Sequence, residues 1–278
     1  TKTHVCCHID HGYTFRECAE GIDSGFTSVM FDGSKLSLKD NIKKTSKIVK
    51  RAHDAKVSVE GEIGFVGYAN GKSSEGTLPI EAETFAKESN VDAMAISVGN
   101  THLQTNKIAK IDLDKVKEIR ETIPNVSVTT DLIIGFPGET KSQFRDSLDI
   151  VERVRFDKVH ASIYSDRPGT IASRKMGDDV SRDEKKRRMA EIVEVQKNIS
   201  LELNTAFEGT SQIVLVENNS EGIFSGRSRL DKLVYLDGKD VEVGDFVEVT
   251  ITEARTWSLT GQVQRKINNE IEGQLIEY

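Results

Sequence analysis

Imidazole and carboxylate side chains gather at three places in the first part of the chain, each at the end of an apolar run. These places are His8-Ile-Asp-His-Gly12, Glu60-Gly-Glu62 and the stretch that ends at His102. Histidine nitrogen and carboxylate oxygen are common ligands of Zn²⁺, and Asp10 or Glu62 can in addition transfer protons. The three places together predict a divalent metal site with an acid–base group beside it.

Parallel strands are the elements that could bring these groups to one rim. Strand-like runs are expected at 4–9, 26–31, 57–63, 92–98, 126–134 and 156–164. Helical patterns lie between them, and residues 38–55 repeat Ile42, Ile48, Val49 and Ala52 at helical spacing. Alternating strands and helices predict parallel βαβ units, whose catalytic groups lie at the carboxyl ends of the strands. The fold class is therefore α/β, a partial TIM-type barrel of about six strands.

A long helix is expected from 181 to 204 at the end of this barrel. Ser181 and Glu184 have the spacing of a capping box. A stripe expected to be buried consists of Met189, Ile192, Val193, Ile199 and Leu203. The basic run 185–188 is interpreted as a solvated face.

The periodicity changes after residue 205. Short alternating runs at 213–217, 232–236, 246–251 and 260–264 are separated by Gly and Asn/Asp turns, which predicts a small all-β barrel. Two domains are thus expected, a (βα) barrel over residues 1–205 and an all-β barrel over residues 206–278.

Charge and composition exclude several classes of protein. The net charge is −7, and residues 207–278 contribute 13 acidic against 7 basic side chains, so there is no general basic surface for nucleic acid. No apolar run reaches the ~18 residues of a membrane span, so no membrane partner is expected. Three cysteines are too few for a disulfide framework, which favours a reducing, cytoplasmic setting. Because the first residue is Thr1, we expect that an N-terminal portion is missing.

Residues 4 to about 123 resemble the class II, metal-dependent ketose-bisphosphate aldolases. The similar stretches are His8 to Gly12, Gly25-Phe-Thr-Ser-Val-Met-Phe-Asp-Gly-Ser34, Val59-Glu-Gly-Glu-Ile-Gly64 and Asp92-Ala-Met-Ala-Ile-Ser-Val-Gly-Asn100. The resemblance implies Asp10 as general acid/base, with His11 and His102 as Zn²⁺ ligands. It also implies Glu60 or Glu62 in metal binding or proton transfer, and we assign Glu60 to the metal and Glu62 to catalysis. Zn²⁺ would polarise the carbonyl of a phosphorylated ketose for carbon–carbon cleavage by a lyase.

Residues 126–264 resemble a different family, the radical S-adenosylmethionine tRNA methylthiotransferases. The similar stretches are Thr129-Thr-Asp-Leu-Ile-Ile-Gly-Phe-Pro-Gly-Glu-Thr140, Tyr164-Ser-Asp-Arg-Pro-Gly-Thr170, Val243-Gly-Asp-Phe-Val-Glu-Val-Thr-Ile-Thr-Glu-Ala254 and Trp257-Ser-Leu-Thr-Gly261. The last two are similar to that family's TRAM domain, an OB-like β-barrel that binds RNA. The resemblance implies that the loop with Gly135, Gly138 and Glu139 flanks an S-adenosylmethionine pocket, and such a loop is equally typical of a plain turn.

Both resemblances are incomplete. The aldolase family's third histidine and its Gly-Gly-Ser-Gly phosphate loop have no counterpart here. Cys6, Cys7 and Cys18 lack the C-x-x-x-C-x-x-C spacing of the methylthiotransferases. We therefore expect no [4Fe–4S] cluster, and so no cleavage of S-adenosylmethionine by these residues alone. The two resemblances meet near residues 124–127. Three origins of this join stay open: engineering, natural recombination and an error in assembling the sequence.

Three functions follow from these resemblances. The leading one is a methylthiotransferase-like protein that binds tRNA through its TRAM-type barrel. The residues expected to meet RNA are Arg227, Arg229, Lys232, Arg255 and Trp257. The alternatives are a zinc-dependent aldolase and a folded hybrid with neither activity, so the sequence leaves enzymatic activity open.

Overall fold

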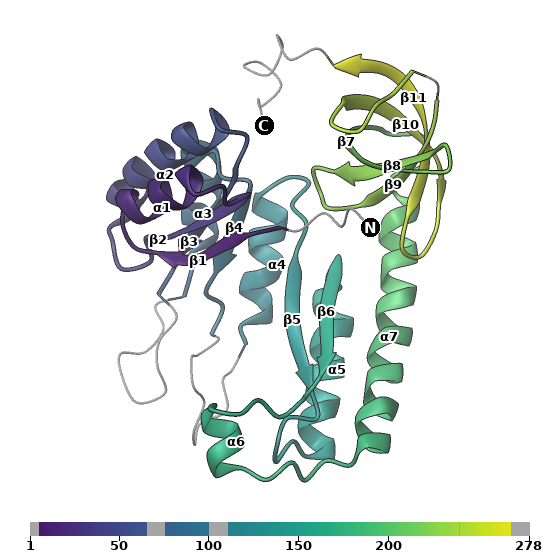
Figure 1. The fold of residues 1–278 in the computed structure, drawn as a ribbon. Helices are drawn as coiled ribbons and strands as arrows, with labels where there is room; N and C mark the ends of the chain where they lie inside the picture. The colour runs from purple at the N-terminus through teal and green to yellow at the C-terminus, as the bar shows by residue number, and fades with distance from the viewer. Residues whose placement is uncertain (1–5, 66–75, 100–110, 239, 268–278) are drawn as a thin grey trace. The chain divides into compact units, whose positions relative to one another are not determined.

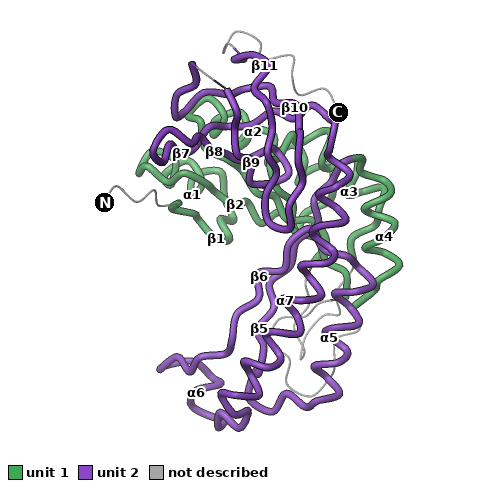
Figure 2. The backbone as a smooth tube through the Cα atoms, turned by 90° about the vertical axis from the view of Figure 1, so that its right-hand side faces the viewer, with its two compact units in different colours: residues 1–124 green, residues 125–278 purple. Residues whose placement is uncertain are grey.

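The computed structural model describes residues 6–65, 76–99, 111–238 and 240–267 (Figure 1). The chain forms two compact units, residues 1–124 and 125–278 (Figure 2). The division between them falls where the sequence changes its resemblance.

The first unit alternates strands with helices. Its elements are β1 (His8–Gly12), α1 (Phe15–Asp23), β2 (Ser28–Asp32), α2 (Leu38–His53), β3 (Ser58–Ile63), α3 (Pro79–Ser89), β4 (Ala93–Ile96) and α4 (Leu113–Thr122). The strands pair in parallel in the order β1-β2-β3-β4. The helix expected over 38–55 is present as α2, and its four expected apolar residues are buried.

The first unit's core lies on one face of this sheet. Val29 and Phe31 of β2 and Val59 and Ile63 of β3 pack with apolar residues of the helices. Side chains alternate along a strand, so the residues between these four belong to the opposite face. That face receives Asp32 from β2, and from β3 it receives Glu60 and Glu62.

The second unit begins with a smaller parallel sheet. Its first elements are β5 (Thr129–Ile134), α5 (Lys141–Val154), β6 (Lys158–Ile163), α6 (Ile171–Lys175) and α7 (Arg182–Thr205). All six strands expected before residue 165 are therefore present. Among the described residues, however, their hydrogen bonds form one sheet of four strands and one of two, not a single sheet. A six-stranded barrel stays a prediction.

Helix α7 buries charged residues that we expected to be solvated. Ser181 caps it by accepting a hydrogen bond from Glu184 N–H, while the Glu184 carboxylate bonds Arg187 and Arg188. Lys185 and Arg188 are each only 3% exposed, so the solvated interpretation of 185–188 was wrong for these two. Lys185 reaches Asp178 at 2.6 Å, and Arg188 reaches Glu139 at 2.5 Å. Their burial is possible because each charge has a carboxylate partner.

The apolar stripe expected along α7 is correct only in part. Ile192 and Ile199 are buried, whereas Val193 is 44% exposed. The buried side of the helix also carries Gln196, Ser200 and Asn204. The apolar residues alone therefore do not define the buried face of α7, because that face includes three polar residues and leaves out Val193.

A closed five-stranded barrel follows α7. Its strands are β7 (Ser211–Ser220), β8 (Ile223–Ser228), β9 (Leu233–Asp237), β10 (Phe246–Ala254) and β11 (Leu259–Ile267), in the order β10-β11-β9-β8-β7. The buried core consists of Val214, Val216, Val234, Leu236, Val241, Val247, Val249, Ile251 and Leu259. The sequence runs located four strands and missed β8, whose Phe224-Ser-Gly-Arg-Ser stretch has little apolar alternation. No helix in the described parts of the chain has the length and apolarity to span a membrane.

Gly226 provides a test of how tightly this barrel closes. A Cβ at this position would collide with the backbone of Leu215 and Val216 on β7. We expect Gly226→Ala to lower the free energy of unfolding of the barrel by roughly 2–4 kcal/mol, because backbone cannot move aside cheaply. Urea unfolding followed by the fluorescence of Trp257, the chain's one tryptophan, measures this change. Gly177→Ala is the control, since no atom lies within 4 Å of its added Cβ, and equal losses in both variants would contradict the prediction.

Candidate metal centre

An extra residue in β1 directs His11 toward the carboxylates. Ile9 pairs with Val29, but Gly12 pairs with Phe31, so three steps along β1 match two along β2. His11 takes a left-handed backbone conformation, with φ of 58°. Such a bulge changes the face on which the next side chain lies. His11 would otherwise share the core side with Ile9, which packs against the apolar cluster.

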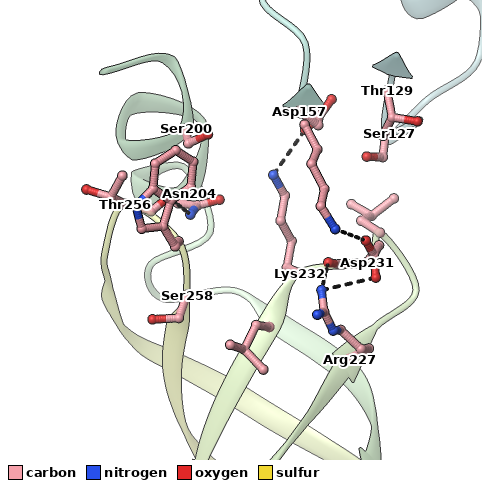
Figure 3. Close-up of a pocket in the computed structure, with 14 residues that line it drawn as sticks. Ser127, Thr129, Asp157, Ser200, Asn204, Arg227, Asp231, Lys232, Thr256 and Ser258 are labelled. Atoms are coloured by element: carbon pink, nitrogen blue, oxygen red, sulfur yellow. Dashed lines mark hydrogen bonds and ion pairs between the residues drawn. The ribbon is translucent and has the colours of Figure 1, made fainter. Parts of the chain in front are cut away.

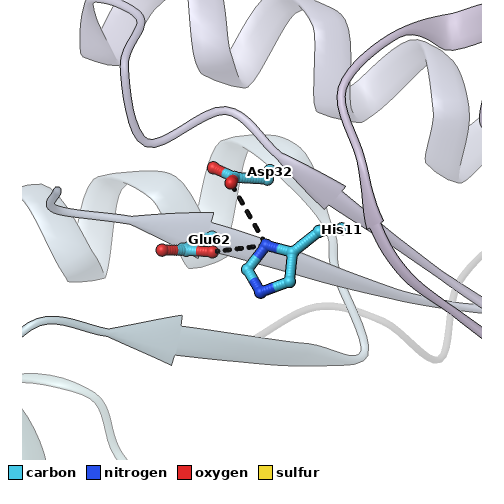
Figure 4. Close-up of side chains that lie close together, drawn as sticks. All are labelled: His11, Asp32 and Glu62. Atoms are coloured by element: carbon cyan, nitrogen blue, oxygen red, sulfur yellow. Dashed lines mark hydrogen bonds and ion pairs between the residues drawn. The ribbon is translucent and has the colours of Figure 1, made fainter. Parts of the chain in front are cut away.

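His11, Asp32 and Glu62 converge at the carboxyl ends of β1, β2 and β3 (Figure 4). The Nδ1 atom of His11 lies 3.1 Å from Asp32 Oδ2 and 3.5 Å from Glu62 Oε2. The parallel register sets Asp32 directly opposite Glu62. One ligand atom from each of the three residues lies within 4.8 Å of the others.

Glu62 is the most perturbed group of the cluster. It is 5% exposed, and burial, helped by the nearby charge of Asp32, raises its pKa to about 7. Its Oε2 atom is buried without a hydrogen bond in the described structure. The buried amide of Asn41 on α2 donates to the Glu62 carbonyl oxygen at 2.9 Å and so fixes the end of β3. A buried carboxylate oxygen without a donor is costly unless a proton or cation meets it.

Asp32 is held in place by the turn that follows β2. Its Oδ1 atom accepts hydrogen bonds from Ser34 N–H at 3.1 Å and from the Ser34 hydroxyl at 2.6 Å. The other oxygen, Oδ2, is left facing His11. The donor set of one imidazole nitrogen and two carboxylate oxygens suits a divalent cation such as Zn²⁺, so these residues fit the metal expected from the sequence.

The residues expected at this site from sequence are only partly brought together. Asp10 lies beside His11, with Oδ1 at 3.8 Å from Nε2, and its side chain is 78% exposed. Glu60 lies 3.8 Å from His8 Nε2. Glu62 joins the cluster, although we assigned it to catalysis and Glu60 to the metal. Both assignments stay predictions, and His102 lies outside the described residues.

Asp32 was missed in the sequence. It lies inside the stretch 25–34 that carries the aldolase resemblance, and it is the last residue of β2. Asp32 could have been found from its position, because it ends a parallel strand at the same edge of the sheet where β1 carries His11 and β3 carries Glu62.

The glycine loop of the second unit is satisfied by its own side chains. Gly135 and Gly138 take φ of 70° and 82°, which confirms a tight turn before α5. Gly135 N–H donates to Glu139 Oε2 at 2.8 Å, and Gly138 N–H donates to Asp179 Oδ1 at 2.7 Å. Glu139 in addition pairs with buried Arg188. These contacts explain the loop as a structural turn, and S-adenosylmethionine binding there stays a prediction.

Most of the cations expected to meet RNA have acidic partners. Arg227 pairs with Asp231 at 3.2 Å, Arg255 with Glu253 at 3.0 Å, and Lys232 with Asp157 at 3.2 Å. Arg229 is exposed at the turn after β8. Trp257 is 57% exposed. The aromatic face is thus more available to a ligand than the paired charges are.

The cysteines do not lie together as a cluster-binding set. Cys6 and Cys7 are exposed, whereas Cys18 lies on the buried side of α1. Burial raises the pKa of the Cys18 thiol to about 11, which keeps it protonated at neutral pH. The expectation of no iron–sulfur cluster stays a prediction.

Comparison with known protein families agrees with the resemblances and with the fold. A family model described as fructose-bisphosphate aldolase class-II matches residues 1–148, and a TRAM domain model matches residues 206–264. The first match covers more than half of the chain. The chain therefore belongs to the class-II fructose-bisphosphate aldolase family over residues 1–148, and it carries a TRAM domain over residues 206–264.

Curated relatives come from a second family. The chain is 43% identical over 167 residues to the tRNA-2-methylthio-N(6)-dimethylallyladenosine synthase of Acetivibrio thermocellus, which covers 59% of this chain and 35% of the relative. It is 45% identical over 152 residues to the enzyme of that name from Carboxydothermus hydrogenoformans, covering 54% and 34%. The chain thus spans about a third of the length of these relatives.

Among solved structures, the YdjI aldolase from Escherichia coli K12 is similar to this chain with a TM-score of 0.45 and 18% identity. The similarity covers 72% of this chain and 68% of that one.

The raised pKa of Glu62 predicts a dependence of stability on pH. In the metal-free protein the folded state binds a proton between the unfolded value of about 4.5 and the folded value of about 7, so stability falls as pH rises through this window. We expect Glu62→Gln to remove this loss and to gain roughly 2–3 kcal/mol over the wild type between pH 5 and pH 8. Urea unfolding followed by circular dichroism, with a chelator present, measures the difference at each pH. Parallel pH profiles for the two proteins would show that Glu62 is not the titrating group.

Proposed function

We propose that this chain holds a divalent cation, Zn²⁺, at His11, Asp32 and Glu62 and uses it in aldol cleavage of a phosphorylated ketose. The observation that carries the proposal is the convergence of these three side chains at one edge of the sheet. Membership of the aldolase family supports it. The bulge that turns His11 toward the two carboxylates supports it as well. His11 has a strained backbone, and strained residues of this kind are typical of functional sites.

The residues of the cluster have separate tasks in this proposal. His11 binds through Nδ1, since a ring nitrogen that binds a cation carries no proton, and its Nε2 lies near Asp10. Glu62 gives up the proton that burial favours and supplies Oε2, the oxygen that has no hydrogen bond in the described structure. Glu60 and His102 complete the proposed set of metal-binding residues. A bound Zn²⁺ would supply Lewis-acid polarisation of the substrate carbonyl.

Asp10 is placed to act on the substrate rather than on the cation. Its carboxylate is largely exposed and is held within 3.8 Å of the His11 ring. An exposed carboxylate is open to a sugar hydroxyl. We assign it the removal of the hydroxyl proton when the carbon–carbon bond breaks. Glu62 is the second group proposed to take part in proton transfer.

Metal affinity tests the cluster directly. We expect His11→Ala and Glu62→Gln each to weaken Co²⁺ binding by at least about 10-fold, because each removes one donor. Titration of the chelator-stripped protein, followed by the visible absorption of bound Co²⁺, gives the affinity. His53→Ala is the matched control, since His53 also pairs with a carboxylate, Asp92, at 2.9 Å outside the cluster. Unchanged binding in both cluster variants would contradict the proposed site.

Asp10 allows the chemistry to be separated from metal binding. We expect Asp10→Asn to leave Co²⁺ affinity within about 2-fold and to lower the rate of fructose 1,6-bisphosphate cleavage by about 100-fold or more, as for loss of a general base. The measurement is release of triose phosphate by the zinc-loaded protein. An equal rate in the variant would exclude Asp10 from the reaction, and no cleavage by the wild type would exclude this substrate.

We also propose that the TRAM barrel binds tRNA, as in a methylthiotransferase-like protein. The identity of about 43% to tRNA-modifying enzymes and the closed barrel of the TRAM domain support this second function. The paired cations restrict how the barrel can do so, because an arginine bound to Asp231 or Glu253 gives little net attraction to phosphate. If neither the metal centre nor RNA binding is found, the third interpretation, a folded hybrid without activity, is preferred.

The salt dependence of RNA binding shows whether the paired cations of the barrel bind phosphate. Each phosphate that a free cation neutralises contributes about −0.7 to −0.9 to the slope of log K against log salt concentration. We expect binding of a labelled tRNA anticodon stem-loop with a slope shallower than about −2, because several barrel cations are already paired. Fluorescence anisotropy of the RNA at several salt concentrations gives the slope. A steep slope would show that the ion pairs open on binding, and no anisotropy change would contradict RNA binding.

A further inference from the structure

A cavity of about 190 Å³ lies within the second unit, where the end of α7 meets the barrel (Figure 3). Ser127 and Thr129 line it from the start of β5, and Ser200 and Asn204 line it from α7. The barrel contributes Trp257 and neighbouring loop residues. A cavity of roughly 150 Å³ is known to hold a benzene ring, so this space accepts one heteroaromatic ring.

Two buried polar atoms, each on a residue that lines the cavity, have no hydrogen-bond partner in the described structure. Asn204 is 3% exposed, and its Nδ2 group donates to Arg255 O at 2.8 Å and to Thr256 O at 3.2 Å. These two bonds fix the orientation of the amide, so the buried atom without a partner is the oxygen, Oδ1. The hydroxyl of Ser127 is likewise buried and unpaired. In Figure 3 Ser127 and Asn204 lie on opposite sides of the cavity.

Each cation that lines the cavity already has an acidic partner. Lys232 pairs with Asp157 at 3.2 Å, and Lys158 pairs with Asp231 at 3.1 Å. Arg227 also pairs with Asp231. These pairs leave little attraction for a phosphate. The walls instead require an uncharged ligand with a hydrogen-bond donor for the Asn204 oxygen.

Trp257 gives this cavity a stacking surface. Trp257 is 57% exposed and lines the cavity, so part of the residue is open to a ligand. Tryptophan beside a small polar cavity is the combination by which proteins hold single unpaired bases, because stacking needs no particular sequence and hydrogen bonds then select the base edge.

We propose that this cavity takes one unpaired nucleobase that carries an exocyclic amino group, stacked on Trp257 and donating to Asn204 Oδ1. Adenine, cytosine and guanine carry such a group, whereas the one base donor of uridine is its ring N3–H, which lies between two carbonyl groups. The Ser127 hydroxyl meets the opposite edge of the base as donor or acceptor. The inference deepens the second proposed function, because the base is taken to belong to the bound tRNA.

The single tryptophan makes the cavity directly observable. Cytidine, adenosine and uridine are titrated into the full-length chain while Trp257 emission is recorded. We expect quenching by cytidine and adenosine at concentrations at least about 5-fold below those needed for uridine, the factor of one added hydrogen bond. Ser127→Ala should weaken cytidine binding by about 5-fold. Ser162→Ala is the control, since Ser162 is an exposed strand serine outside the cavity.

Titration with RNA in place of nucleosides separates the proposed base site from RNA binding in general. The labelled anticodon stem-loop is compared with a version whose loop nucleotides lack their bases, by anisotropy and by Trp257 emission. We expect the abasic RNA to bind about 10-fold more weakly and to leave Trp257 unquenched. Equal binding of both RNAs with no change in Trp257 emission would overturn the base site and keep RNA binding.

The remaining outcomes also decide between the two proposals. Quenching by nucleosides without any binding of the stem-loop would keep the base site and overturn the proposed tRNA function. Equal quenching by uridine and cytidine would overturn the requirement for an amino group. Cytidine binding that is equal in Ser127→Ala and Ser162→Ala would remove Ser127 from the site.

Discussion

One extra residue in β1 decides which side chain meets the carboxylates of β2 and β3. Without the bulge, strand alternation would send His11 toward the apolar core and would leave Asp32 and Glu62 facing each other alone. The Asp32 and Glu62 carboxylates have oxygens within 4.8 Å of each other, and two negative charges this close repel. The arrangement is therefore stable only when a proton, an imidazole or a cation lies between them. The positive φ of His11 is the local cost of satisfying that constraint. Burial, and after it the charge of Asp32, raises the pKa of Glu62 to about 7.

Helix α7 plays a comparable organising part in the second unit. Near its start, Lys185 and Arg188 are buried with acidic partners from the loops after β5 and α6. Further along, Gln196 donates to Phe156 O at 2.9 Å, and Asn204 reaches the loop before β11. Polar side chains, each directed at a specific backbone or carboxylate group, therefore fix the helix against both the sheet and the barrel. Apolar packing alone would tolerate small rotations of the helix that these contacts forbid.

Much of this architecture could be predicted from the sequence, because strands and helices follow from apolar periodicity. The six early strands, α2 and four of the five barrel strands are examples, whereas β8 was missed because its residues alternate weakly. Of the three metal ligands assigned from the sequence, His11 lies in the cluster, Glu60 lies beside His8, and His102 is outside the described residues, while the cluster also holds Glu62, assigned to catalysis, and Asp32, which was missed. Such details depend on the bulge and on strand register. Burial of Lys185 and Arg188 escaped prediction too, because residue type alone does not reveal that the loops carrying Asp178 and Glu139 fold against them.

The boundary between the two compact units lies between Pro124 and Asn125. The first unit fills its core with residues from β1 to β4 and their helices, and the barrel fills its own core from β7 to β11. A crossover at this point would leave each of these two sets of core residues whole. One half could then be replaced without any change to the core residues of the other. The change of resemblance along the sequence therefore falls after the first core is complete and before the barrel core begins.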